Sequence, residues 1–572
     1  MTTSEVESPR TQPAPGPDNG GMRSRSPRQW VTPAALTGLG VVLFSAYLAE
    51  AQKLPIFGDG AAQALQAWDM LHGNVLLHGW ALSDVSFYTT ELPQYLLIEF
   101  FAGLNPDVVH IAAAMTYALL VVLTAALAKG KATGREALVR ILIPVGIMLA
   151  PALGPILSSR GTSSAWIVLS APDHTGTQVP LVLTWLVLDR LRPRWWLPFL
   201  VAAMLAWVEI ADSTAIFEGA LPIAAVCVAR MYRRRGPLSG QWYDLALAAG
   251  AAASVGASMA VLALIRSHGG FALNPAPPSL STISGMTNHL WVKVQSLLTL
   301  FGANFFGMTL GQALLPIVHL VAVALVAWGV ARAVRRFFAD DDLGTQVVTA
   351  SFLMLLAAFI FGYRDAARET VGLLPMGAML AGRMLAPRVL PARTALALAA
   401  GFACFGTSLV SQIAGPALPS PDRPLASWLQ AHHLTYGLSM TWYTSSGITL
   451  YSHDQVRVRD VKTSAGGGVA KWSWNTEASW YSPRLHDARF LILNPCQATP
   501  TGPLFDALGR PAATYFVEGV TVLVWHANLL AGHAPPTPIA SRAPATSGGQ
   551  GGPPDQIGTG SRSSVLYQVM CG

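Results

Sequence analysis

The chain has 572 residues, of which 52% are apolar and 12% are charged, and its mean hydropathy is +0.42. Soluble domains carry about 25% charged residues, so this composition excludes a soluble globule and indicates a polytopic membrane protein. A disordered scaffold is excluded too, because such chains are poor in apolar and aromatic residues. The net charge of +7 does not indicate nucleic acid as a partner, since the arginines lie in short loops between apolar stretches.

Residues 1–30 are rich in Pro, Ser and Gly and contain three arginines near their end, so we expect a disordered cytoplasmic tail. Eleven apolar stretches that can each span a bilayer then follow. They lie near residues 33–52, 108–128, 138–157, 176–190, 195–211, 215–231, 243–265, 310–330, 345–362, 370–386 and 394–414. The sequence therefore predicts an all-α polytopic membrane domain over residues 31–418.

Basic residues gather in alternate loops between these stretches. The basic loops are 129–140, 190–194, 230–235, 332–336 and 383–393. Loops rich in Lys and Arg stay on the cytoplasmic side of a membrane. We therefore predict a cytoplasmic N-terminus, with the loop 53–107 and the C-terminal segment on the outer side.

The composition changes near residue 422, where alternation of apolar and polar residues replaces the long apolar runs. This alternation predicts strands at 448–451, 456–461, 489–493 and 520–525, and an amphipathic helix at 424–433. We predict an extracytoplasmic α+β domain over residues 419–572 with a flexible segment at 535–562. Its aromatic residues either stack on sugar rings or form the domain's own core and rim. They are Trp442, Tyr443, Trp472, Trp474, Trp480 and Tyr481.

Two of the four cysteines, Cys496 and Cys571, lie in this external domain, where the compartment permits disulfides. We expect a bridge between them, with two free thiols as the alternative. The absence of a CxxC pair excludes a zinc ribbon or an iron–sulfur cluster. The sequence also contains no P-loop, no GxGxxG after a strand and no HExxH, which disfavours an ATP-driven pump, a dehydrogenase and a zinc protease.

The first external loop, residues 53–107, contains the largest number of candidate functional residues. Asp59 follows the first span and precedes a helix predicted over 61–72, which we expect to lie on the membrane surface. Four apolar residues share one face of that helix: Ala61, Leu65, Trp68 and Leu71. Asp59 can cap the helix, or it can serve as a general base whose pKa is raised at a dry interface. The two roles are compatible.

A first span, an external acidic residue (Asp59), a surface helix and a glycine turn, with AWDMLHGN at 67–74, resemble the C-type glycosyltransferases of GT-C fold. Members of that family are polytopic enzymes that take a sugar from a polyprenyl-phosphate carrier and pass it to an acceptor outside the membrane. An appended external domain also fits several bacterial members. Many members have two adjacent acidic residues, whereas Gly60 follows Asp59 here. Asp84 or Glu91, later in the loop, can supply a second carboxylate.

Two further groups of acidic residues lie near the predicted outer boundary. Asp173 and His174, in the second external loop, can hold an acceptor or a sugar hydroxyl, or they can simply form a turn in which Asp173 or Thr175 caps the next span. Glu209, Asp212 and Glu218 surround a membrane turn. These three acids can bind a sugar or a divalent cation, the one cofactor that the sequence leaves open, or they can merely keep the turn hydrated.

Arg364 and Arg368 lie in a loop that topology predicts to be poor in positive charge. Guanidinium groups bind phosphate through paired hydrogen bonds, and the resemblance implies that basic residues in late external loops hold the carrier phosphate. The alternative is internal pairing of Arg364 with Asp365 or Glu369. Lys293 and Arg266 are weaker candidates of the same kind.

The resemblance implies an inverting single displacement at the outer face of a bacterial plasma membrane. The donor is a polyprenyl-phosphate sugar, and the acceptor is a cell-envelope glycan, lipid or protein. Asp59 would be the base, and the two arginines would stabilise the leaving phosphate. The alternative is a transporter or flippase. It is less favoured because transporters place ionisable groups near the bilayer midplane and show repeated halves, which this sequence lacks.

Overall fold

The structure is a computed structural model that describes residues 28–56, 58–153, 164–234, 241–274, 280–339, 341–364, 366–386, 392–418, 420, 422–464, 468–493 and 501–531. Several predictions lie outside these residues. They concern the tail before residue 28, the Cys496–Cys571 bridge, the pairing of Asp365 and the segment 535–562. These stay predictions.

The first three quarters of the chain are helical. The helices are α1 (Arg28–Ala51), α2 (Gly58–Leu71), α3 (Glu91–Ala102), α4 (Asp107–Lys129), α5 (Gly134–Ala152), α6 (Ser164–Leu169), α7 (Thr175–Arg190), α8 (Leu197–Ala211), the π-helix η1 (Ile216–Ala220), α9 (Leu221–Arg234), α10 (Trp242–Ser267), α11 (Ile283–Leu300), α12 (Leu310–Arg336), α13 (Leu343–Phe361), the 3₁₀ helix η3 (Ala367–Thr370), α14 (Leu373–Leu385) and α15 (Ala392–Ala414). Each apolar stretch that the sequence predicted is mainly helical over its described residues. Within the described residues, five helices are long and apolar enough to cross a membrane: α1 from Pro33, α4, α10, α12 and α13.

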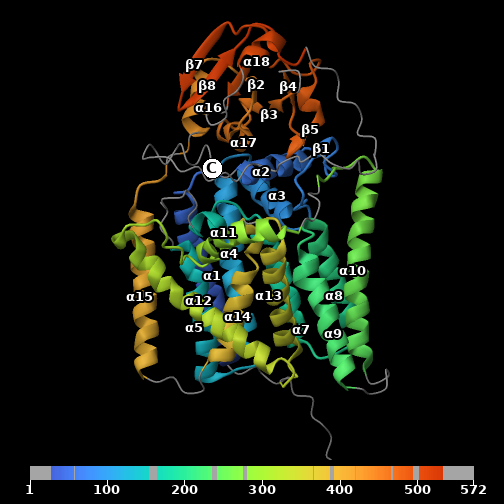
Figure 1. Cartoon of the computed structure of the whole chain (residues 1–572), viewed down its shortest axis with the longest axis vertical. Helices are drawn as coiled ribbons and strands as arrows, with labels where there is room; N and C mark the ends of the chain where they lie inside the picture. Colours follow the sequence, from blue (N-terminus) through green and yellow to red (C-terminus); the bar gives the residue numbers. More distant parts are fainter. Residues whose placement is uncertain are drawn as a thin grey trace, which may run out of the picture.

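Small residues let these helices approach one another closely. Gly329 on α12 faces Ala381 on α14, where an added Cβ would lie 2.7 Å from the Ala381 Cα. Lipid offers no hydrophobic driving force between helices, so close packing of this kind holds a bundle together. The result is a bundle whose long helices run roughly parallel, with α10 at one edge and α15 at the other (Figure 1).

The loop after α1 folds into α2, the two-residue strand β1 (Trp80–Ala81) and α3. Helix α2 begins three residues earlier than predicted. It packs on α3 and on α17 (Trp442–Tyr451) of the C-terminal part, which bury it along most of its length. The apolar face and the small residues Ala61, Ala62 and Ala64 fit between these two layers, and the position of α2 at the membrane surface stays a prediction.

The C-terminal part contains a mixed sheet with the strand order β4-β3-β2-β6-β8-β7. Its strands are β2 (Tyr436–Ser439), β3 (Arg457–Thr463), β4 (Val469–Lys471), β6 (Phe490–Leu493), β7 (Ala513–Val517) and β8 (Val520–Val524). Strand β2 runs parallel to β3 and to β6, and the remaining pairs are antiparallel. The described helices here are α16 (Asp422–Ala431), α17, the 3₁₀ turn η4 (Ala478–Tyr481) and α18 (Thr501–Leu508).

Three of the four predicted strands are observed, as β3, β6 and β8, and the predicted helix is observed as α16. The strand predicted at 448–451 was wrong, because these residues form the end of α17. Two parallel strands need a crossover connection, usually a helix, and α17 is the crossover between β2 and β3. Four alternating residues were too short a pattern to distinguish helix from strand.

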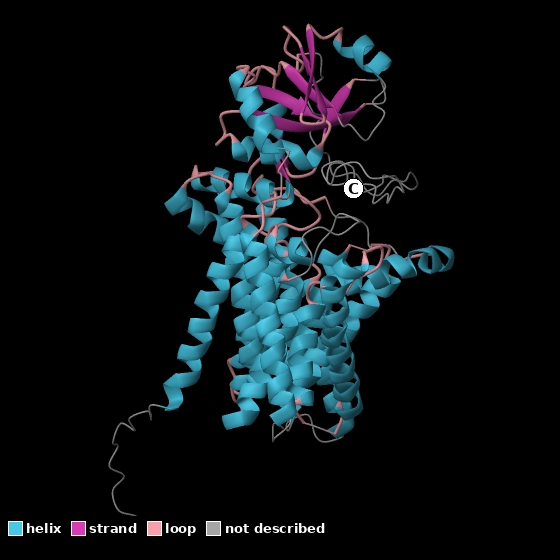
Figure 2. Ribbon diagram, turned by 90° about the vertical axis from the view of Figure 1, so that its left-hand side faces the viewer, coloured by secondary structure: helices cyan, strands magenta, loops and turns pink. Residues whose placement is uncertain are grey.

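The C-terminal sheet sits at one end of the helical bundle (Figures 1 and 2). A small second sheet joins the two parts, because β1 in the first loop pairs antiparallel with β5 (Thr476–Glu477). Trp80 and Trp480 also meet across this junction with ring centroids 4.9 Å apart. The first loop is therefore enclosed between the bundle and the sheet.

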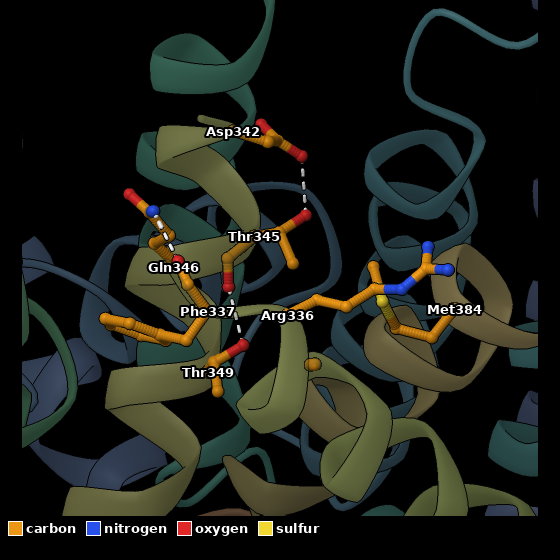
Figure 3. Close-up of a pocket in the computed structure, with 8 residues that line it drawn as sticks. Arg336, Phe337, Asp342, Thr345, Gln346, Thr349 and Met384 are labelled. Carbon is orange, nitrogen blue, oxygen red and sulfur yellow. Dashed lines mark hydrogen bonds between the residues drawn. The ribbon is translucent and has the colours of Figure 1, made fainter. Parts of the chain in front are cut away.

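The opposite end of α13 has a small hollow lined by residues of α12, α13 and α14 (Figure 3). Its polar groups are used by the helix termini. The Thr345 hydroxyl donates to Asp342 at 2.6 Å, and the Gln346 side-chain amide donates to the Phe337 carbonyl at 2.6 Å. The second bond satisfies a backbone carbonyl at the C-terminal end of α12, and the first joins two side chains at the start of α13.

Candidate active site

Asp59 lies in the first turn of α2, with its side chain 13% exposed. It is the second residue of the helix, so it is not the N-cap. A carboxylate in the first turn is still stabilised by the helix dipole. Gly60 explains why no second acidic residue follows, since a Cβ there would lie 2.8 Å from the Ala171 Cβ and 3.0 Å from Val109. The carboxylate at position 59 therefore has no acidic neighbour in its own sequence.

Its neighbours come from distant parts of the chain. The Arg368 guanidinium, on η3, donates to Asp59 Oδ2 at 3.3 Å, and the Asn475 amide donates to Asp59 Oδ1 at 3.1 Å. Burial raises the pKa of Asp59 to about 6, with Arg368 partly offsetting this effect and with Asp173 and Asp84 adding to it. A carboxyl of this pKa is ionised at neutral pH and accepts a proton more readily than an ordinary aspartate.

Asp173 lies close to this centre and is held by α2 itself. Gln63, one helical turn after Asp59 on the same face, donates its side-chain amide to Asp173 Oδ1 at 2.5 Å. Burial raises the pKa of Asp173, and Arg368 and His174 lower it. The charge of Arg368 thus lowers the pKa of both carboxyl groups.

His174 occupies the N-cap position of α7 in the left-handed conformation, with φ +54°. Its side chain does not cap the helix. It bonds through Nδ1 to Asp212 Oδ2 at 2.6 Å instead, and Asp212 Oδ1 accepts from the Thr214 backbone N–H at 2.9 Å. Burial opposes the charged form of His174, but the Asp212 carboxylate outweighs it and raises the histidine pKa to about 10. His174 is therefore a fixed cation at neutral pH.

Arg364 forms ion pairs with Asp84, at 2.5 Å, and with Glu369, at 2.9 Å. The internal pairing with Glu369 that the sequence offered as the alternative is thus present. The Arg364 side chain is still 40% exposed. It lies in the same loop as Arg368, four residues away, so the structure brings both arginines to the side of the site where Asp84 lies.

Glu91 is buried, and its carboxyl group lies at the start of α7 and not beside Asp59. Its Oε1 accepts from the backbone N–H of Thr177 at 3.0 Å and from the Thr177 hydroxyl at 3.2 Å, and Thr90 also donates to this carboxyl. Glu91 therefore links α3 to the start of α7. Burial raises the pKa of Glu91 to about 8.

The three acids around the turn after α8 do not converge on one point. Asp212 pairs with His174, whereas Glu209 accepts from Ser254 on α10 at 2.9 Å and Glu218 accepts from Gln178 on α7 at 2.7 Å. No group of three or more metal-ligating side chains in suitable positions occurs in the described part of the chain. The divalent cation stays an untested expectation.

The two weaker candidates for phosphate binding lie elsewhere. Lys293 donates to the backbone carbonyls of Phe359, at 2.8 Å, and Gly362, at 2.5 Å. A cation at this end of α13 stabilises the helix C-terminus and anchors the start of the arginine loop. Arg266 is exposed on the last turn of α10.

Two of the aromatic residues of the C-terminal part, Trp480 and Tyr481, contact other residues of that part. The Arg459 guanidinium carbon lies 3.7 Å from the centroid of the Trp480 ring. The Tyr481 hydroxyl donates to the Asp460 carbonyl at 2.5 Å. His432 is exposed and stacks on Trp428 with ring centroids 3.9 Å apart. The structure does not describe the side chains of Trp442 and Tyr443.

Sequence reasoning missed Gln63 and Asn475. Gln63 had a usable signal, because it lies one turn from Asp59 on the same helix. Asn475 had none, because it is 416 positions away from Asp59.

The sequence matches no protein-family model and shows no significant similarity to a curated protein. The structure is similar to ArnT from Cupriavidus metallidurans bound to undecaprenyl phosphate, with a TM-score of 0.51 and 12% identity over 89% of this chain and 100% of that chain. The chain therefore shares the GT-C fold of that structure, and the fold that the resemblance implied is confirmed.

Two other solved structures align less well. ArnT of the same organism in the apo state gives a TM-score of 0.42 and 12% identity over 90% of this chain and 100% of that chain. The other is AglB from Archaeoglobus fulgidus, an archaeal oligosaccharyltransferase in complex with an inhibitory peptide and a dolichol-phosphate. It gives a TM-score of 0.43 and 12% identity over 82% of this chain and 70% of that chain.

Proposed function

We propose that the protein is a membrane glycosyltransferase that transfers a sugar from a polyprenyl-phosphate donor to an acceptor on the outer side of the membrane. The observation that carries this proposal is the convergence of Asp59 and Arg368, a candidate base and a candidate phosphate ligand, at the junction of the two parts of the chain. The similarity of fold to ArnT bound to undecaprenyl phosphate supports it. The acceptor is a glycan, a lipid or a protein of the cell envelope.

In the proposed reaction, Asp59 removes the proton from an acceptor hydroxyl. The acceptor oxygen forms a bond to the anomeric carbon while the bond from that carbon to the phosphate oxygen breaks, so the configuration inverts. The proton ends on Asp59, and the carrier leaves as a polyprenyl phosphate with one additional negative charge. No general acid is needed, because the phosphate leaves ionised.

Arg368 and Arg364 are proposed to stabilise the charge that develops on this phosphate. A donor phosphate that draws Arg368 away from Asp59 would also remove the guanidinium charge that lowers the basicity of the carboxylate. The donor would then activate the base by binding. The fixed cation of His174 keeps positive charge in the site when Arg368 moves.

The placement in the membrane is part of the proposal. Eleven spans with a cytoplasmic N-terminus put the basic loops inside, and they put the arginine loop, the first loop and the C-terminal part outside. On this topology residues 31–418 form the membrane domain and residues 419–572 form the extracytoplasmic domain. The hollow at the other end of α13 then faces the cytoplasm.

The test uses the full-length protein in detergent with a polyprenyl-phosphate sugar and without any ion gradient. Asp59→Asn is expected to lower kcat at least about 100-fold, the range for a general base, while membrane insertion is unchanged and thermal unfolding stays cooperative and occurs at no lower temperature. Asp487→Asn, at an exposed aspartate on the C-terminal part, is the matched control and should transfer at the wild-type rate. Transfer by Asp59→Asn at the wild-type rate would remove Asp59 from the role of base. Movement of the lipid-linked sugar across sealed vesicles with no glycosidic product would support the transporter alternative.

A further inference from the structure

Asn475 lies in the C-terminal part of the chain and contacts Asp59 on α2. Its side-chain Nδ2 donates to Asp59 Oδ1 at 3.1 Å, and its Oδ1 accepts from Gln66 Nε2 at 3.2 Å. Gln66 lies on the same helix as Asp59 and is buried. The orientation of the Asn475 amide is therefore determined from both of its ends, with the NH₂ group toward the carboxylate.

The backbone of Asn475 is in the left-handed region, with φ +52°. This conformation is unfavourable for residues with a Cβ, although asparagine tolerates it better than most. Strain of this kind persists where the surrounding structure imposes it, and it is frequent at functional sites. Here the strained residue is the one that contacts the candidate base.

The surrounding segment is fastened to the first loop. Thr476 and Glu477 pair with β1, and the Ala478 backbone N–H donates to the Gly79 carbonyl at 2.9 Å. On the other side of Asn475, Asn274 donates to the carbonyl of Ser473. These contacts place the Asn475 side chain over the N-terminus of α2.

Asp59 thus has a different partner on each oxygen. Oδ1 accepts from Asn475, and Oδ2 accepts from Arg368. If the donor phosphate draws Arg368 away, as the proposed function requires, Asn475 is the contact that still orients the carboxylate. A hydrogen bond from a neutral amide can do this without the strong loss of basicity that a second cation would cause.

We infer that Asn475 is a positioning residue that orients the Asp59 carboxylate, so that the C-terminal part of the chain completes the catalytic centre of the membrane part. This inference rests on the proposed function. It predicts that loss of the Asn475 amide lowers kcat with little effect on the KM for the donor, because the amide acts through Asp59.

Other charged groups also act on Asp59, and the test must leave them in place. They are Arg368 from η3, Asp173 and His174 from the segment before α7, Asp84 after β1 and, more weakly, Asp460 from β3. None of them belongs to the segment that carries Asn475. A substitution at Asn475 therefore removes one hydrogen bond to the ionised carboxylate, and this loss raises the pKa of Asp59.

Asn475→Gly is the sharpest variant, because glycine adopts φ +52° without strain. A residue of merely structural importance would lose stability in this variant. We expect the opposite, with a thermal unfolding temperature that is unchanged or higher. kcat should fall about 10- to 100-fold through misorientation of the base, and the donor KM should stay within about threefold.

The independent readout is the protonation of Asp59, measured by carbodiimide labelling of carboxyl groups and mass spectrometry across a pH series. The labelling midpoint of Asp59 should move upward by about half a pH unit in Asn475→Gly. Asn475→Asp, which replaces the donor by a like charge, should move it further upward. Glu518→Gly is the matched control, because Glu518 has a similar φ of +50° in the turn between β7 and β8.

A labelling midpoint that stays at the wild-type pH in both Asn475 variants overturns the inference, whatever the activity. Wild-type kcat in Asn475→Gly together with a shifted midpoint also overturns it, because the contact then has no catalytic consequence. A shifted midpoint in a protein whose wild type transfers no sugar overturns the proposed function and leaves the contact established.

Discussion

The Arg368 guanidinium lies 3.3 Å from the Asp59 carboxylate, although 309 positions separate the two residues in the sequence. One residue belongs to the first turn of α2 and the other to the short 3₁₀ turn after α13. An acceptor hydroxyl that reaches Asp59 would therefore meet a phosphate bound by Arg368 within a few ångströms. In the proposed in-line displacement the sugar carbon lies between the base and the leaving phosphate, so Arg368 would have to move away from Asp59 when the donor binds.

Replacing Arg368 by glutamine should lower kcat about 100- to 1,000-fold, because the variant loses a charged donor to the leaving phosphate. Arg368→Lys should recover only part of the rate, since an ammonium lacks the planar pair of donors. Initial rates with a polyprenyl-phosphate sugar measure the effect. Arg266→Gln is the matched control, and equal losses at positions 266 and 368 would contradict the proposed role.

The pH dependence of kcat/KM should show an acid limb near pH 6, because Asp59 must be ionised to act as the base and its pKa is about 6. Activity should fall tenfold for each pH unit below this midpoint, as expected for a single protonation. Rates measured from pH 4.5 to 8 with constant ionic strength test it. A flat profile over this range would contradict the assignment of Asp59 as the essential base.

Asp59 should also lower stability at neutral pH. Its pKa is raised from 3.8 to about 6 in the folded protein, so its favourable contribution is complete below pH 3.8 and is lost as the pH rises through 6. Asp59→Asn should therefore unfold at a higher temperature than the wild type at pH 7.5, with the difference disappearing near pH 4. Thermal unfolding in detergent at both pH values measures it, and an equal gain at both would show that the effect is not electrostatic.

Asp212→Asn should lower the pKa of His174, because the neighbouring carboxylate is what keeps that histidine protonated up to about pH 10. The imidazole would then lose its charge near neutrality, and transfer should fall about tenfold on the alkaline side. The expected signature is a new basic limb in the pH–rate profile below pH 8. An unchanged alkaline profile would show that the charge on His174 is not used.

Gly176→Ala should destabilise the protein by about 1–3 kcal/mol, the typical cost of overpacking. An added Cβ would lie 2.6 Å from Glu91 Oε1, and the carboxylate is held by the start of α7. Denaturation of Gly176→Ala, Glu91→Ala and the double variant gives the coupling. The double variant should be more stable than the sum of the two single losses predicts, and strict additivity would argue against a direct contact.

Much of the helical part could be predicted, because its physical cause is local. Apolar runs of bilayer length must satisfy their own backbone hydrogen bonds, so they form helices wherever they occur. Ionisable residues at the boundaries of such runs are costly, which is why Asp59, Asp173, His174, Asp212 and Arg368 were identified as candidates. Each of them lies in or next to the site.

What the sequence determined by itself was the class of architecture and the residue types available for chemistry. Tertiary structure decided which of them meet. Glu91 was separated from Asp59 and assigned to the start of α7, whereas Asn475 was brought to it by the pairing of β5 with β1. Hydropathy and periodicity report which face of a segment is buried, but they do not report which distant segment buries it. A contact over 416 positions depends on long-range packing, so only the folded chain defines it.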